Sequence, residues 1–337
     1  MRENCSDNNF WRIDGGNGAT FFFSAASYAA WRKSLEFYRA VSWRSTGKKL
    51  LLTGAYPLLK RRATLSPADI AAVVGRELGL AELPVFGSEC SAMISPTRDK
   101  AIIHRHGFGY EKIAVGQSFA GIARELEIYR ILARRRPTVF AYSRLGEEIQ
   151  RSGEVHFFMH GADGRFSEQI PPVRELLLPL AEFFRLNGNR ILPWEKQWDS
   201  LAPDAEKLTS RILREDRNGT TLVGLVHRDF KPWNVKRGAI PLFFDFESAA
   251  FDGCPLEDFF NYTVDPALRK KTPESVWRMV RKYAFPAAAE LLHRLDIPAH
   301  ESGRYWRWYL LERYVFWHKQ NQQNFADQFL TLYDISR

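Results

Sequence analysis

Short β-type runs occupy one stretch of this chain and helical patterns occupy most of the rest, which narrows the folds it can adopt. A helix-period segment, Phe119–Arg135, interrupts the β-type runs, and the chain beyond residue 160 is mainly helical in pattern. The β-type runs are separated by turn signals. They are Leu83–Gly87, Ala92–Ser95, Ala101–His104, Tyr110–Val115, Val139–Ser143 and Val155–His160. This order predicts an α+β fold with two lobes, the first a small antiparallel β-rich lobe with one helix.

The second predicted lobe is larger and mostly helical. Its predicted helices are Val173–Leu186, Pro203–Glu215, Glu274–Leu295 and Gly303–Asn321. Before the β runs, Ser66 followed by Pro67 is a typical helix start and Gly79 a typical helix end, so a further helix is expected there. We therefore divide the chain into an N-terminal extension (1–65), a β-rich lobe (66–160) and a helical lobe (161–337).

The N-terminal extension carries most of the positive charge. Residues 1–62 hold 11 Lys and Arg against 4 Asp and Glu, within a formal net charge of +9 for the chain. Residues 1–18 are predicted to be disordered and residues 24–44 to form a helix with a basic face. This segment either contacts a membrane surface peripherally or packs on the main body with its basic side in solvent. The second interpretation is favoured, because surface helices generally carry a charged face.

Composition argues against several classes of protein. The three cysteines include no Cys-x-x-Cys pair, so neither a disulfide framework nor a thiolate zinc site is expected. The N-terminus does not resemble a secretion signal, and no apolar run reaches the roughly 18 residues of a membrane span. No nucleic-acid-binding motif accompanies the basic charge. We expect a cytoplasmic protein that does not bind nucleic acid.

One segment carries a recognisable chemistry. Residues 227–234 read His-Arg-Asp-Phe-Lys-Pro-Trp-Asn, and Asp-Phe-Glu follows at 245–247. Short predicted strands, Leu222–Val226 and Leu242–Phe244, lie on either side, with another at Asn234–Lys236. An acid, an amide five positions later and a second acid after a short strand form the layout that kinase-type phosphoryl transfer uses.

Each residue type suits one part of that reaction. Asp229 lies where a strand gives way to a loop, and is expected to orient and deprotonate an attacking hydroxyl. Asn234 and Asp245 offer the oxygen ligands that Mg²⁺ prefers. Lys231 is expected to contact the transferring phosphate as a point charge. His227 completes this catalytic segment, and its ring is expected to hold the loop in place.

These motifs resemble the aminoglycoside phosphotransferase and choline kinase-like family of the protein-kinase-like superfamily. Residues 227–234 are similar to its His-Gly-Asp-x-x-x-x-Asn loop, with Arg228 in place of the usual Gly. Arg228 and Lys231 also match the corresponding loop of serine/threonine protein kinases. Residues 245–247 resemble the family's Asp-x-Glu and residues 253–258 its Gly-x-Pro-x-x-Asp. The resemblance extends from about Leu83 to the C-terminal helices.

The resemblance implies a small-molecule kinase that uses ATP and Mg²⁺. Only twelve residues separate Asp245 from Asp258, which leaves no room for the activation loop of a protein kinase. Asp258 resembles the acid that braces the catalytic loop, and we group it with the residues that hold the nucleotide. Lys112 is the best match to the lysine that grips the nucleotide phosphates, and Glu125 to its partner glutamate. Lys100 is the alternative lysine, and Glu127 is the alternative glutamate.

Three further segments are assigned less specifically. Phe157–Gly161 resembles the connection between the lobes, which places Met159 and His160 beside the purine. Ser95–Asp99 is a candidate phosphate-binding turn, whereas Gly107–Gly109 is more typical of a hairpin turn. The basic and aromatic run Arg304–Tyr309, with Arg313 and Trp317, either lines an acceptor pocket or, as we favour, forms a core helix whose arginines reach outward.

The sequence therefore predicts an ATP-dependent phosphotransferase that acts on a hydroxyl of a small molecule or saccharide. Two alternatives stay open. One is a nucleotide-binding pseudokinase with a regulatory role. The other is a kinase of a lipid-linked saccharide at the membrane surface, recruited through residues 1–62.

Overall fold

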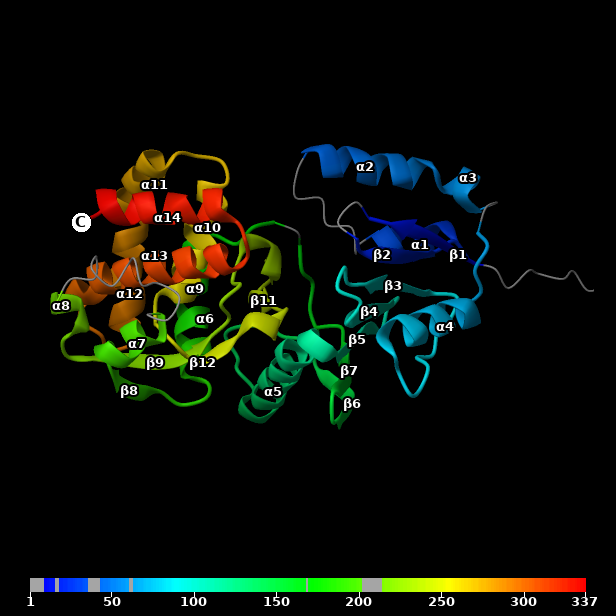
Figure 1. The fold of residues 1–337 in the computed structure, drawn as a ribbon, viewed down its shortest axis with the longest axis horizontal. Coiled ribbons are helices and arrows are strands. Elements are labelled where there is room, and N and C mark those ends of the chain that lie inside the picture. The colour runs from blue at the N-terminus through cyan, green and yellow to red at the C-terminus, as the bar shows by residue number, and fades with distance from the viewer. Residues whose placement is uncertain (1–8, 16–17, 36–42, 61–62, 168, 202–213) are drawn as a thin grey trace, which may run out of the picture. The chain divides into compact units, whose positions relative to one another are not determined.

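The computed structural model describes residues 9–15, 18–35, 43–60, 63–167, 169–201 and 214–337. They form two units (Figure 1). Unit 1 comprises the chain up to Tyr129 together with Ser143–Gly161, and unit 2 comprises Arg130–Tyr142 and the chain from Ala162 onward. Strands dominate the first and helices the second, so the protein has the predicted α+β fold.

A seven-stranded antiparallel sheet is the centre of unit 1. Its strand order is β1-β2-β3-β4-β5-β7-β6. The strands are β1 (Phe10–Asp14), β2 (Thr20–Ser24), β3 (Cys90–Ile94), β4 (Lys100–Arg105), β5 (Gly109–Val115), β6 (Leu145–Arg151) and β7 (Glu154–His160). Gly107 and Gly109 have positive φ angles in the tight turn between β4 and β5, which confirms the hairpin predicted there.

Two predicted strands of this region are wrong. Leu83–Gly87 is a loop, in which Pro84 has no N–H to donate to a sheet while Phe86 is inserted into the core. Val139–Ser143 makes only an isolated bridge, between Ala141 and Leu242. Conversely, β6 was not predicted, because its polar residues are those of an exposed edge strand rather than of a half-buried one.

The N-terminal residues differ most from the prediction. Phe10–Asp14 is not disordered but pairs with β2, which in turn pairs with β3. Phe10 and Phe22 are buried in the same core cluster as β3, β4 and β5, so burial of aromatic side chains stabilises this part of the sheet. Of the helix predicted over 24–44, the described part is α1 (Tyr28–Ser34), capped by the Ser27 hydroxyl, and the start of α2; residues 36–42 lie outside the described chain.

Four further helices complete unit 1 or begin in it. The helix predicted from Ser66 is α4 (Pro67–Leu78), which starts with a capping box between Ser66 and Asp69 and ends at Gly79 with φ +67°. The others are α2 (Trp43–Gly54), α3 (Tyr56–Lys60) and α5 (Phe119–Arg135), the last with the predicted bounds.

Unit 2 contains small sheets among its helices. The three-stranded sheet has the order β12-β9-β8, and β10 pairs with β11. The strands are β8 (Arg190–Pro193), β9 (Thr220–Val226), β10 (Val235–Lys236), β11 (Leu242–Phe243) and β12 (Ala250–Gly253). The helices are α6 (Val173–Arg185), α7 (Trp194–Leu201), α8 (Arg214–Arg217), α9 (Glu257–Thr263), α10 (Asp265–Leu268), α11 (Pro273–Met279), α12 (Phe285–Arg294), α13 (Ser302–Lys319) and α14 (Gln323–Ile335).

The helical predictions agree with these bounds for the most part. A π-helical stretch, Val280–Ala284, joins α11 to α12 into the single helical region that was predicted. Most of the predicted helix Pro203–Glu215 lies outside the described residues. The short elements β8, α7, β12 and α9 were not predicted.

The basic and aromatic run in α13 belongs to the core, as favoured. Tyr305, Trp306, Trp308 and Tyr309 are buried. The arginines of this helix do not all reach solvent, however, because Arg313 is 1% exposed. Its guanidinium is paired with Glu312, whose carboxylate compensates the buried charge.

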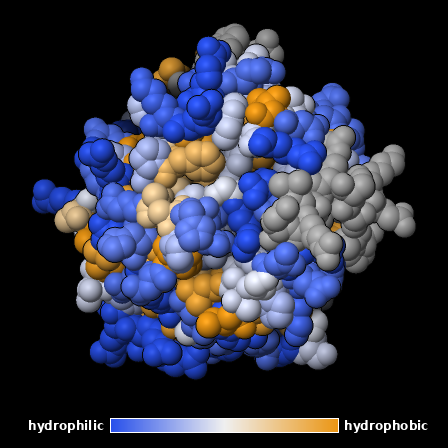
Figure 2. Space-filling view, turned by 90° about the vertical axis from the view of Figure 1, so that its left-hand side faces the viewer, coloured by the Kyte–Doolittle hydropathy of each residue, from blue (hydrophilic) through white to orange (hydrophobic). Residues whose placement is uncertain are grey.

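One face of unit 2 is mainly hydrophilic. Figure 2 shows a mainly hydrophilic face with separate small hydrophobic areas. Scattered apolar residues of this kind are normal for a globular protein. None of the described helices is both long and apolar enough to cross a membrane.

Candidate active site

The loop between β9 and β10 holds the predicted catalytic residues, and helix α9 fixes its backbone. Both carboxylate oxygens of Asp258 accept backbone amides of the loop, from His227 at 2.7 Å and from Arg228 at 2.8 Å. The Asn261 side-chain amide donates to the Arg228 carbonyl at 2.8 Å. Asp258 is 5% exposed, and its burial raises the pKa of this carboxyl above its ordinary value. Its contacts are those expected of an acid that braces the loop, and they are directed at the protein backbone.

Arg228 occupies a backbone conformation that normally favours glycine. Its φ angle is +62°, in the left-handed region. This explains in physical terms why a glycine suits the corresponding position of the family that the loop resembles. The turn redirects the chain between His227 and Asp229, so that their side chains have different surroundings: His227 is fully buried, whereas the Asp229 side chain is 36% exposed.

His227 joins the loop to the segment after β11. Its Nε2 lies 2.9 Å from the Phe244 carbonyl oxygen, which can only accept, so Nε2 carries the proton. The ring also contacts the Phe230 and Phe246 rings. His227 is completely buried, and its contacts are those expected of a ring that holds the loop in place.

Asp229 and Asn234 are in direct contact. The Asn234 side-chain amide donates to the Asp229 backbone oxygen at 2.8 Å and to Asp229 Oδ2 at 2.9 Å. These two bonds fix the NH₂ end of the amide toward Asp229 and direct its oxygen away from it. The Lys231 ammonium lies 2.7 Å from the other carboxylate oxygen, Oδ1. The loop therefore presents a partly exposed carboxylate held by an amide and by a cation.

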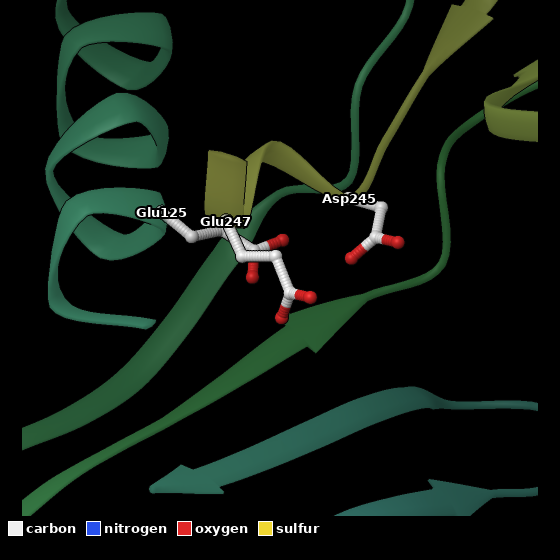
Figure 3. Close-up of side chains that lie close together, drawn as sticks. All are labelled: Glu125, Asp245 and Glu247. Atoms are coloured by element: carbon white, nitrogen blue, oxygen red, sulfur yellow. The ribbon is translucent and has the colours of Figure 1, made fainter. Parts of the chain in front are cut away.

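Asp245 and Glu247 lie on the segment that follows β11. Asp245 has φ +70° and ψ +60°, and this left-handed residue begins a short 3₁₀ turn, Phe246–Ser248. Figure 3 shows the Asp245 and Glu247 side chains projecting from this segment. Carboxylate oxygens of Asp245 and Glu247 lie within 4.8 Å of one another, a separation that one cation can bridge.

The donor set of unit 2 fits a hard divalent cation. Asp245 and Glu247 supply neighbouring carboxylate oxygens, and Asn234 is the residue predicted to add an amide oxygen. Mg²⁺ takes oxygen ligands of this kind and usually retains several waters, so it needs few protein ligands. These three residues include no Cys or His, the usual ligands of zinc, so the set suits magnesium better than zinc.

A cluster of aromatic and charged side chains adjoins Asp229, and the sequence reading missed its central acid. Asp265 on α10 is fully buried and lies 3.5 Å from the Lys231 ammonium. Lys231 also lies above the Trp233 and Trp317 rings, at 5.6 and 5.3 Å from their centroids. Arg269 binds the other Asp265 oxygen at 3.1 Å and stacks on Trp317. In the sequence, Asp265 followed by Pro266 indicates only the start of a helix. Its contacts with Lys231 and Arg269 could therefore not be predicted.

In unit 1, the two residues chosen from the sequence for nucleotide binding form an ion pair. The Lys112 ammonium on β5 lies 2.6 Å from Glu125 Oε2 on α5. Both side chains are buried, with 7% and 0% exposure. The alternatives, Lys100 and Glu127, are more exposed than this pair. A buried pair of this geometry holds the lysine in one position, which a phosphate-binding cation requires.

The turn between β3 and β4 is well ordered by side chains. Asp99 receives hydrogen bonds from the Ser95 hydroxyl at 3.1 Å and from the Ser118 backbone amide at 2.9 Å, and it also contacts the Thr97 hydroxyl. Arg98 has φ +59° at the tip of the turn. The predicted phosphate-binding segment is thus a compact turn whose Asp99 carboxylate accepts hydrogen bonds from two hydroxyls of the turn and from the amide of Ser118.

Met159 and His160 lie at the end of β7, next to the boundary between the units. Met159 is buried, and the backbone amides of His160 and Gly161 donate to Arg144 at 2.8 Å and to Phe108 at 2.9 Å. These amides are therefore used by the protein itself. The assignment of this segment to the purine stays a prediction.

Comparisons with known proteins give matches among solved structures. No protein-family model matches this chain, and no curated protein matches it. One similar structure is the gentamicin complex of APH(2″)-IIa, at 13% identity and a TM-score of 0.43, covering 80% of this chain and 96% of that one. A thermostable mutant of aminoglycoside phosphotransferase APH(4)-Ia with AMP-PNP and hygromycin B has 16% identity and a TM-score of 0.44, with 79% and 97% covered. Choline kinase LicA from Streptococcus pneumoniae has 10% identity and a TM-score of 0.41, with 79% and 97% covered.

These similar structures are aminoglycoside phosphotransferases and a choline kinase. They are of the kind that the motifs at 227–234 and 245–258 resemble.

Behind the catalytic loop lies a buried charge network that the sequence did not reveal. The Arg228 guanidinium lies 3.1 Å from Glu257 Oε1, and Arg313 pairs with Glu312 at 2.7 Å. Burial raises the pKa of Glu257 to about 8, while the Arg228 and Arg313 charges oppose this rise. Glu312 keeps a lowered pKa, because the charge of Arg313 and the hydrogen bonds from it outweigh the burial of its carboxyl. The network couples the backbone turn at Arg228 to α9 and α13.

Proposed function

We propose that this protein is a phosphotransferase that moves the terminal phosphate of ATP to a hydroxyl of a small molecule or saccharide. The observation that carries the proposal is the contact between Asp229 and Asn234 on a loop braced by Asp258. A carboxylate held in one orientation by a neighbouring amide, and still partly open to solvent, suits a general base. Because the donor is ATP, we expect the reaction to take place in the cytoplasm.

In the proposed reaction, the acceptor hydroxyl gives its proton to Asp229 as its oxygen bonds to the terminal phosphorus. The bond from that phosphorus to the bridging oxygen breaks, and ADP leaves with the electron pair. Lys231 stabilises the negative charge on the phosphoryl oxygens and, 2.7 Å from Asp229 Oδ1, holds this carboxylate in place. Asn234 and Asp245 would hold Mg²⁺, with Glu247 beside them, and the ion supplies charge neutralisation on the phosphates.

We assign Lys112 to the nucleotide phosphates and Glu125 to the positioning of Lys112. Their buried ion pair supports this assignment. Burial of two charges costs desolvation free energy, and a functional role for the lysine would account for this cost. The compact turn Ser95–Asp99 is the proposed phosphate-covering segment, because its order does not depend on glycine. Asp258 acts on the catalytic loop and not on the nucleotide itself.

A saccharide is the acceptor that the neighbourhood of Asp229 favours. The Trp233 ring lies beside Lys231 and is only partly buried, whereas Lys231 and Arg269 both lie over the Trp317 ring. An aromatic ring beside a cationic N–H donor suits a sugar, which presents C–H groups and hydroxyls together.

The decisive test is the variant Asp229→Asn assayed with ATP, Mg²⁺ and a panel of sugars and amino alcohols. The amide keeps the shape but cannot accept the proton, so turnover falls by at least about 100-fold while the protein stays folded. Retained turnover would remove Asp229 from the reaction. ATP binding by the wild-type protein, measured by thermal shift, with no transfer to any acceptor would favour the pseudokinase alternative instead.

A further inference from the structure

Helices α2 and α3 present leucine side chains to solvent. Leu50, Leu51 and Leu58 of α2 and α3 are 69%, 75% and 72% exposed. Leu50 and Leu51 lie on α2, and Leu58 lies on the following short helix α3. The described surface exposes few other leucines to this degree, and an exposed group of large apolar side chains generally marks an interaction site.

Other residues of this helical segment pack against the rest of unit 1, so the exposed leucines are not the side chains that anchor it. Leu52 and Tyr56 pack against the cluster of Phe23, Trp31 and Leu35. The Trp31 indole nitrogen donates to the Leu52 carbonyl at 3.0 Å. Helix α2 lies along the outer side of α1 and strands β1 and β2 (Figure 1). Its orientation is therefore fixed, with leucines outward.

Positive charge flanks the exposed leucines. A hollow of about 610 Å³ between α1 and α2 is lined by Arg32, Lys33 and Lys49 together with Leu50. Arg32 and Lys33 are exposed. The described residues Gly18–Leu35 and Trp43–Lys60 contain no Asp or Glu. Every full charge within these two described segments is thus positive.

We propose that this leucine–lysine surface, formed by Arg32, Lys33, Lys49, Leu50, Leu51 and Leu58, binds an anionic phospholipid membrane. Apolar side chains flanked by cations are typical of elements that lie in the membrane interface, where leucines enter the acyl boundary and lysines contact lipid phosphates. The partner must be negatively charged and apolar over a broad area. A second copy of this chain would bring the same positive charges together, which opposes association. The inference does not depend on the proposed phosphoryl transfer.

The test is co-flotation of the full chain with vesicles of phosphatidylcholine alone and of phosphatidylcholine mixed with phosphatidylglycerol. We expect binding to the anionic vesicles, weak binding to the neutral ones, and release at high salt, because screening shortens the range of the lysine–lipid attraction. Lys33→Gln and Lys49→Gln should each reduce partitioning about fivefold. Leu51→Asp and Leu58→Asp should each reduce it about tenfold or more.

Matched control variants lie in unit 2. Ile191 on β8 is 69% exposed, like Leu50, and Lys270 is an exposed lysine of the same unit. Ile191→Asp and Lys270→Gln should leave vesicle binding unchanged. Circular dichroism and thermal unfolding establish that each variant is folded, which is expected because the substituted side chains are in solvent.

Three outcomes would overturn the proposal. The first is that the wild-type chain does not float with anionic vesicles at low salt. The second is that Leu51→Asp and Leu58→Asp bind vesicles as well as the control variants do. The third is a wild-type dimer, detected by light scattering, that these leucine variants convert to a monomer while vesicle binding is absent throughout.

Discussion

Asn234 donates its side-chain amide to Asp229 twice, at 2.8 Å to the backbone oxygen and at 2.9 Å to Oδ2. One side chain therefore fixes both the backbone turn and the carboxylate of the proposed base. Asn234 is 2% exposed, so its orientation is set by these bonds rather than by solvent. Because both bonds use the NH₂ group, the amide oxygen is turned away from Asp229.

Asn234→Asp should disable the reaction with little loss of fold. A second carboxylate beside Asp229 has no N–H to donate, and the two negative charges repel, so the pKa of one of them rises. We expect kcat to fall by at least about 100-fold. The measurement is steady-state turnover across a range of Mg²⁺ concentrations. Unchanged kcat at saturating Mg²⁺ would show that Asn234 does not orient the base.

Asp258→Asn should destabilise the catalytic loop. Both carboxylate oxygens of Asp258 accept backbone amides, and an Asn side chain would turn an NH₂ group toward one of these N–H donors. An unsatisfied buried donor of this kind costs about 2–3 kcal/mol of unfolding free energy. Urea denaturation measures the change. Asp296→Asn is the control, because Asp296 is exposed and its left-handed backbone also suits Asn; an equal effect of both substitutions would contradict the bracing role.

Much of this architecture was accessible from the sequence, because strong local signals agreed with tertiary packing. The helix at Phe119–Arg135 and the helix after Ser66 have clear periodicity and caps, and both were predicted closely. The spacing between Asp229 and Asn234 placed both residues on one loop. Lys112 and Glu125, which form an ion pair, were chosen because the resembled family has a strand lysine and a partner glutamate in the next helix.

The elements that were missed depend on contacts between distant segments. Strand β1 sits in a polar stretch whose composition suggests disorder, and it is ordered by pairing with β2 and by burial of Phe10. Asp265 becomes important only because α10 places it beside Lys231. Glu257 and Arg313 were not separable from surface charges in a single sequence, because their burial depends on α9 and α13 packing together.

The ion pair of Lys112 with Glu125 allows stability to be separated from function. Lys112→Met leaves the carboxylate of Glu125, which is 0% exposed, without its lysine, and should lower the unfolding free energy by about 3–5 kcal/mol. The double variant Lys112→Met with Glu125→Leu should recover most of that loss but remain unable to bind ATP tightly. Isothermal titration with ATP and urea denaturation measure the two effects.

The exposed pair of Arg151 with Glu82 is the matched control in unit 1. Its side chains are 48% and 70% exposed at a separation of 3.0 Å. Arg151→Met should change stability by less than about 1 kcal/mol and leave ATP affinity as it is. If the double variant at Lys112 and Glu125 bound ATP as the wild-type protein does, the pair would be structural and the phosphate-binding assignment would be wrong.

Loss of the proton on Glu257 should lower the stability of the protein as the pH rises. Its pKa in the folded protein is about 8, above the ordinary 4.5, so the folded state retains a proton that the unfolded state has released. The stability associated with this proton is fully present below about pH 4.5 and is lost as the pH approaches 8. Glu257→Gln cannot titrate, and its melting temperature should fall less than that of the wild-type protein between these pH values. Glu290→Gln, at an exposed ion pair, should behave like the wild type. Parallel pH profiles for Glu257→Gln and the wild type would mean that Arg228 keeps Glu257 ionised throughout.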